Sequence, residues 1–105
     1  MASGIKIEDI VVGVGIKAER GHVASVYWKG TLNRGDSFGE GERTFLAGSR
    51  EVIAGLSLGV IGMCVGGRRR LRVSPHLGFR DQVVPGVPAN AVLVIEVELL
   101  GVRII

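Results

Sequence analysis

The chain has 105 residues and a formal net charge of +3, with 47% hydrophobic and 22% charged residues. This length predicts one domain, whose folding buries roughly 65% of the unfolded chain's surface. The composition excludes a disordered chain, and no apolar run approaches the roughly 20 residues of a membrane-spanning helix, so we expect no membrane insertion.

The first ten residues, MASGIKIEDI, lack the basic and apolar regions of a secretory signal, so we expect a cytoplasmic protein. Cys64 is the only cysteine, which excludes an intramolecular disulfide and a cysteine-rich metal site. A free cysteine is typically buried, and we expect the same of Cys64.

The first predicted element is a strand over residues 24–32, where apolar side chains such as Val26 and Trp28 alternate with polar ones. The sequence Asn-Arg-Gly-Asp at residues 33–36 is typical of a turn. Ser37 and Phe38 then begin the second arm of a predicted hairpin.

The next segment changes to helical spacing. Its apolar residues are Val52, Ile53, Leu56 and Val60. Ser49 is the predicted N-cap, and Glu51 falls in the predicted first turn. Gly55 and Gly59 each cost about 1 kcal/mol relative to alanine, so this short helix must be held by packing on the sheet.

Two further strands complete the prediction. Leu71 alternates with arginines in a strand that ends at Pro75, with Arg69 on the same side as Leu71 and therefore in need of a polar partner. Residues 91–100, AVLVIEVELL, read as a central strand in which only Glu96 and Glu98 mark a solvent face.

Together these elements predict an α+β fold, a twisted antiparallel sheet wrapped around one short helix, in a single domain over residues 1–105. Such an arrangement leaves an apolar hollow between helix and sheet that can hold a small apolar ligand. Its predicted lining is Trp28, Phe38, Val52, Ile53, Leu56 and Ile95.

Five segments then match a known family in its own order. Residues 26–32 (VYWKGTL) are similar to V-x-Y-x-G-x-L, and residues 51–56 (EVIAGL) to E-V-I-x-G-W. Residues 75–79 (PHLGF) resemble P-x-L-G-Y-G, residues 87–91 (VPANA) resemble I-P-x-N-A, and residues 97–100 read VELL. The order resembles that of the FKBP-type peptidyl-prolyl cis-trans isomerases over nearly the whole chain.

The resemblance implies a half-barrel sheet around one helix, and isomerisation of X-Pro bonds in peptides and unfolded proteins. It also implies no metal, no cofactor, a monomer, and binding of macrolide immunosuppressants. An apolar pocket suits this chemistry, because rotation about an amide bond removes the charge separation that water stabilises.

The resemblance also implies a set of substrate-binding residues, of which Ile53 offers its backbone N–H to a bound carbonyl. The set is Trp28, Phe38, Val52, Ile53, Leu56, Phe79 and Ile95. Several positions depart from the family pattern. Trp28 and Phe79 replace tyrosines, Gly39 replaces an aspartate, Leu56 replaces a tryptophan and Ile95 replaces a phenylalanine. These departures predict reduced activity.

Three alternatives remain. The missing carboxylate at Gly39 favours a binding module of this fold that recruits a protein or peptide and has little or no catalytic activity. Trp28, Leu56 and Ile95 could serve core packing alone. The arginine-rich residues 68–72 could bind nucleic acid, although strand alternation favours a solvated face, so nucleic acid is not the expected partner.

Overall fold

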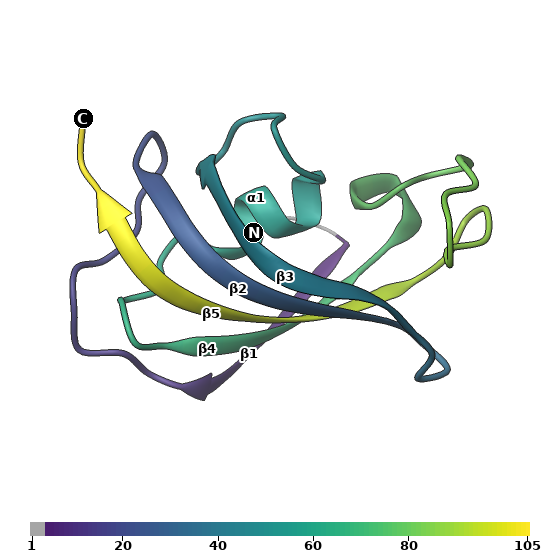
Figure 1. Ribbon diagram of the computed structural model, residues 1–105, viewed down its shortest axis with the longest axis horizontal. Helices are drawn as coiled ribbons and strands as arrows, with labels where there is room; N and C mark the ends of the chain where they lie inside the picture. Colours follow the sequence, from purple (N-terminus) through teal and green to yellow (C-terminus); the bar gives the residue numbers. More distant parts are fainter. Residues whose placement is uncertain (1–3) are drawn as a thin grey trace.

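Five strands form one antiparallel sheet that curves around a short helix, as Figure 1 shows for the computed structural model. The structure describes residues 4–105. In chain order the elements are β1 (Ile5–Val11), β2 (Val23–Leu32), β3 (Ser37–Leu46), α1 (Ala54–Gly59), β4 (Arg68–Val73), the 3-10 helix η1 (Pro75–Leu77) and β5 (Leu93–Arg103). The strand order is β1-β4-β5-β2-β3, so β1 and β3 are open edges and the sheet does not close. The predicted α+β half-barrel is confirmed.

The β2–β3 hairpin has the predicted alternation and the predicted turn. Ala24, Val26 and Leu32 are buried on the side of the helix, and the N–H of Gly35 donates to the carbonyl of Leu32 at 2.8 Å to close the turn. Gly35 has a φ of +104°, a conformation that side chains disfavour. The register shifts between Gly30 and Thr31, a bulge that bends the strand pair next to the site described below.

Strand β5 lies at the centre of the sheet, paired with β4 on one side and β2 on the other. It begins at Leu93, two residues later than the start of the predicted segment. Leu93, Val97 and Leu99 are buried against the helix side, while Glu98 is exposed on the other face. The prediction of a central strand is therefore confirmed.

Helix α1 begins later than the sequence predicts, and the prediction of Ser49 as its N-cap is wrong. The side chains expected to start the helix instead satisfy the preceding loop. Ser49 Oγ accepts the N–H of Glu51 at 3.3 Å, and Glu51 Oε1 accepts the N–H of Leu46 at 2.6 Å. The first helical residue is therefore Ala54, and no acidic residue lies in the first turn.

The two helix glycines allow α1 to lie directly on strand β4. A Cβ on Gly55 would come within 2.5 Å of Val73 Cγ1, and one on Gly59 within 2.4 Å of Leu71 Cδ1. Distances this short leave no room for a side chain. The expectation that packing on the sheet holds this glycine-containing helix is confirmed.

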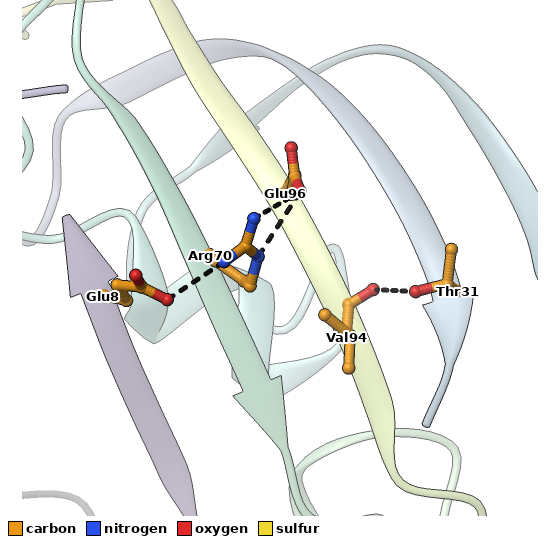
Figure 2. Close-up of polar contacts among 5 residues, drawn as sticks. All are labelled: Glu8, Thr31, Arg70, Val94 and Glu96. Carbon is orange, nitrogen blue, oxygen red and sulfur yellow. Dashed lines mark hydrogen bonds and ion pairs between the residues drawn. The ribbon is translucent and has the colours of Figure 1, made fainter. Parts of the chain in front are cut away.

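The arginines of β4 divide between the two faces as predicted. The side chain of Arg69 is only 11% exposed; its Nε contacts Asp9 Oδ1 at 2.7 Å, and its Nη1 donates to the carbonyls of Gly59 and Ile61 at 2.9 Å. Arg70 points outward and contacts Glu8 and Glu96, each at 3.1 Å (Figure 2).

Two features differ from, or go beyond, the sequence-based expectations. Strand β1 was not predicted; it pairs with β4 and places Ile5 opposite Val73. Cys64 is half-buried rather than buried, because it lies in a loop and forms an isolated bridge with Lys17.

Candidate functional site

A cavity of about 470 Å³ opens between helix α1 and the concave face of the sheet. This volume falls in the range of small-molecule binding sites. Every residue that the sequence assigned to the site lies around this cavity. They are Trp28, Phe38, Val52, Ile53, Leu56, Phe79 and Ile95.

These residues come from segments that are distant in the chain. Trp28 lies on β2, Phe38 near the start of β3 and Ile95 on the central strand β5. Leu56 and Ile95 are 6% and 2% exposed and are also part of the core, whereas Trp28 and Phe38 are half-buried. The cavity is thus a concave extension of the hydrophobic core, with core residues as its floor and half-buried aromatic residues as its walls.

Phe38 is the central aromatic residue of the wall. Its ring centroid lies 6.1 Å from that of Trp28, and 6.4 Å from that of Phe79, which meets it edge to face at 85°. Such arrangements are favoured between aromatic rings. The ring of Phe38 lies directly over the backbone of Gly30, where a Cβ would come within 2.3 Å of Cζ. Glycine at position 30 therefore sets where Phe38 can lie.

Trp28 covers the position of Gly39. A Cβ on Gly39 would stand 3.0 Å from Trp28 Cη2, which is tighter than an ordinary van der Waals contact. The wide indole and the absent side chain thus fit each other. As a result, the cavity has no carboxylate at this position.

The backbone of Ile53 is arranged to leave a donor at the cavity. Its carbonyl accepts the N–H groups of Leu56 at 3.1 Å and Ser57 at 3.0 Å, which begins the helix. Its own N–H has no protein acceptor among residues 4–105. Because Ile53 lines the cavity, this N–H is available to a carbonyl bound there.

The rim of the cavity contains polar residues that the sequence did not assign to the site. They are Arg43, Arg50, Glu51 and Gln82, and Gly78 lines the cavity beside them. Arg43 donates from Nη2 to the carbonyl of Glu51 at 3.1 Å, which joins β3 to the loop before α1. Arg43 lies opposite Val26 in the hairpin, so the two side chains are on the same side of the sheet. Arg50 and Gln82 lie in loops, where no periodicity indicates direction.

The described residues form neither a metal site nor a membrane-spanning helix. Across residues 4–105 no three histidine, cysteine, aspartate or glutamate side chains come together as metal ligands would. No helix in the same range has the length and apolarity needed to cross a membrane.

Comparisons with known proteins identify the family. Residues 15–100 match the family model described as FKBP-type peptidyl-prolyl cis-trans isomerase. The chain is 38% identical over 104 residues to FK506-binding protein 4 of Aspergillus fumigatus, covering 95% of this chain and 21% of that protein. It is 40% identical over 105 residues to FK506-binding protein 4 of Dictyostelium discoideum, covering 96% of this chain and 29% of that protein. The chain therefore spans less than a third of the length of these curated relatives.

Solved structures agree with the family match over the fold. The crystal structure of AtFKBP13 superposes with a TM-score of 0.86 at 30% identity, covering 94% of this chain and 93% of that chain. FkpA from Escherichia coli superposes with a TM-score of 0.81 at 29% identity, covering 97% of this chain and 53% of that chain. The family resemblance of the ordered motifs is thereby confirmed, and with it the isomerase class at the level of the family. The chain belongs to the FKBP-type peptidyl-prolyl cis-trans isomerases.

Proposed function

We propose that this chain catalyses cis-trans interconversion of X-Pro bonds in peptides and unfolded protein segments, and that the apolar cavity is where the proline binds. The observation that carries the proposal is the convergence of aromatic and aliphatic side chains from β2, β3, α1 and β5 on one cavity, in a chain of this family. Phe38, Val52, Ile53 and Phe79 hold the proline, and Trp28, Leu56 and Ile95 form walls and floor.

The chemistry requires no nucleophile and no proton transfer. Planar amide bonds carry charge on the carbonyl oxygen, and water stabilises this charge, so twisting the amide costs less free energy where water is excluded. The apolar lining removes water from the bond. The N–H of Ile53 holds one substrate carbonyl and so fixes the orientation of the peptide.

The activity is expected to be lower than is usual for the family. Phe79 lacks a hydroxyl that could bind the ligand, and loss of one such hydrogen bond costs about 0.5–1.5 kcal/mol, a several-fold to tenfold loss in affinity. Leu56 and Ile95 leave a wider and less polar floor. Gly39 supplies no carboxylate to polarise the substrate.

The direct test is NMR exchange spectroscopy on a short X-Pro peptide, with and without catalytic amounts of the folded protein. Uncatalysed exchange takes tens to hundreds of seconds, so even weak acceleration is measurable. We expect acceleration that a saturating excess of a second proline peptide suppresses. An unchanged exchange rate from folded protein would remove the proposal.

A second experiment asks whether the pair Trp28 and Gly39 limits catalysis. The double variant Trp28→Tyr, Gly39→Asp places a carboxylate at position 39 and also removes the indole that stands 3.0 Å from the new Cβ. We expect faster exchange from the double variant than from Gly39→Asp alone, because the single variant has to displace the indole. Equal rates for all three proteins would show that this position plays no part in turnover.

A binding module without efficient catalysis is the second candidate. The contact between Trp28 and Gly39 favours it, because the indole fills space that a catalytic carboxylate would need. The single tryptophan lines the cavity, so its fluorescence reports occupancy directly. A proline peptide that changes this fluorescence, while its exchange rate stays the same, would identify the binding module.

The remaining properties of the whole protein are proposed on the family's pattern. We propose that the chain acts as a monomer in the cytoplasm and that the same cavity accepts a macrolide ligand. Analytical ultracentrifugation tests the first property. Displacement of a proline peptide by FK506 tests the macrolide.

A further inference from the structure

A second cavity, of about 360 Å³, adjoins the apolar cavity on the side of the loop before helix α1. Its lining residues are Ser49, Arg50, Val52, Ala54, His76, Gly78 and Arg80. Arg50, Val52 and Gly78 line both cavities. The two cavities are therefore neighbours, with Arg50, Val52 and Gly78 between or beside them.

The charge of the second cavity has one sign. Arg50, Arg80 and the basic side chain of His76 line it, and no aspartate or glutamate does. Within residues 4–105 neither Arg50 nor Arg80 has a carboxylate within 4.0 Å, whereas Arg69 and Arg70 both have ion-pair partners. Asp81, which follows Arg80 in the chain, lines a different hollow that His76 and Arg80 also line. Arg50 and Arg80 thus have no ion pair among residues 4–105, and both residues line one cavity.

The backbone of Arg80 is held in a defined conformation at the edge of this cavity. Arg80 has a φ of +57°, in the left-handed region that favours glycine. Its N–H donates to the carbonyl of Pro75 at 2.9 Å, and its carbonyl accepts the N–H of Asn90 at 2.7 Å, so neighbouring backbone groups hold it in this conformation. These two bonds fix the backbone from which the Arg80 side chain extends.

We propose that the cavity of Arg50, His76 and Arg80 is an anion subsite, which binds an acidic or phosphorylated residue of a proline-containing peptide. The inference rests on the proposed function, because it needs the proline to occupy the apolar cavity. Guanidinium groups bind carboxylates and phosphates through paired hydrogen bonds. An extended chain advances about 3.3 Å per residue, so moving the anionic residue along the peptide samples the distance between the two cavities.

The test compares peptides of one sequence that carry alanine, glutamate or phosphoserine at each position within three residues of the proline. Fluorescence of Trp28 gives the dissociation constant, and NMR exchange gives the rate. We expect the best-placed anionic peptide to bind about fivefold more tightly than its alanine counterpart, with phosphoserine ahead of glutamate. This preference should decrease as salt is raised.

The variant Arg80→Gly suits the backbone conformation at this position while removing the charge. Its matched control is Arg72→Gln, which removes one positive charge from the exposed outer face of β4. The readout is the ratio of dissociation constants for the alanine and anionic peptides. We expect this ratio to fall toward one in Arg80→Gly and to persist in Arg72→Gln. An equal fall in both variants would mean that overall charge, not the cavity, produces the preference.

The outcomes separate the two proposals. Acceleration of the alanine peptide without any anionic preference overturns the subsite and leaves the isomerase intact. Absence of exchange for every peptide removes the isomerase, and the subsite is then supported only by anionic peptides that bind in an Arg80-dependent way. A single-stranded DNA oligonucleotide that binds as tightly as the phosphopeptide, and loses its binding in Arg80→Gly, overturns the assignment to a peptide.

Discussion

The two faces of the same sheet differ in how their side chains fill space and pair their charges. On the concave face, apolar side chains pack against α1 and leave a cavity of about 470 Å³. On the convex face, charges alternate in sign along one row that crosses all five strands: Glu8, Arg70, Glu96, Lys29 and Glu40 lie opposite one another in turn. Figure 2 shows the contacts of Arg70 with Glu8 and Glu96 in this row.

A buried face can therefore leave space unfilled, while an exposed face can have charges that are already paired. The concave face is buried yet has an unfilled space, and this space is what a ligand can use. The convex face is exposed, and its central arginine, Arg70, is already paired with Glu8 and Glu96. Because successive residues of a strand point to opposite faces, neighbouring residues of one strand can be used to test the two faces separately.

The largest expected effect is the loss of stability in the variant Leu71→Ala, on the concave side of β4. Leu71 is fully buried beneath Gly59 of the helix, and such a truncation costs about 2–5 kcal/mol of unfolding free energy. The adjacent variant Arg72→Ala, on the convex side, should change stability by less than about 0.5 kcal/mol. Urea denaturation measures both. Equal losses would remove the distinction between the faces.

The next effect is expected from Gly30→Ala, because the new Cβ would stand 2.3 Å from Phe38 Cζ and displace that ring. Displacement of a substrate-positioning group by about an ångström can cost ten- to a hundredfold in kcat/KM. The control is Gly41→Ala on strand β3, where a Cβ would meet nothing within 4 Å. Peptide exchange should fall sharply in the first variant and stay near the unmodified rate in the second.

The variant Phe79→Tyr is expected to have a smaller effect, which is a gain in peptide affinity. The added hydroxyl brings a hydrogen-bond donor to an otherwise apolar wall, and the expected gain in peptide affinity is several-fold to tenfold. Titration followed by Trp28 fluorescence gives the affinity. A weaker affinity would show that the wall at Phe79 contacts only apolar parts of the ligand.

The smallest effect concerns Tyr27 on the convex face. Its hydroxyl donates to Glu40, which raises the pKa of Tyr27 above the ordinary value of 10.0, with lesser contributions from desolvation and from the charges of Glu40 and Glu42. Since the folded state holds this proton more tightly, the contribution of the pair is fully present below pH 10 and is lost as the pH rises through the folded pKa. Tyr27 is the only tyrosine, so tyrosinate absorbance reports it alone. The variant Glu40→Gln should lower the pH midpoint of the Tyr27 titration. An unchanged midpoint would contradict the assignment of the raised pKa to the hydrogen bond with Glu40.

Periodicity was sufficient to predict most of the fold. The alternation in β2 and β5 and the helical spacing near Leu56 placed these elements correctly, because burial of one face dictates such patterns. The start of α1 was not predicted correctly because Ser49 and Glu51 satisfy loop groups, a choice that depends on the geometry of Leu46 and its neighbours. Strand β1 was overlooked although Ile5 and Ile7 alternate with charged residues.

The candidate site was likewise predictable only in part. The apolar lining followed from the ordered motifs, and the structure brings all of those residues to one cavity; their role in substrate binding stays a prediction. The rim residues Arg50 and Gln82 and the conformation of Arg80 could not be predicted. Loop direction depends on contacts between distant segments, such as the bond between Asn90 and Arg80, which no local pattern encodes.

The central position of β5 has a consequence for how the chain can acquire its structure. Strands β2 and β4 each pair with β5 and not with each other, although β5 follows both in the chain. During synthesis, therefore, the β2–β3 hairpin can form early, but the sheet cannot assemble until the segment through residue 103 has left the ribosome. The resulting high contact order predicts slow folding, in which β5 joins the β1–β4 pair to the β2–β3 hairpin in one cooperative step.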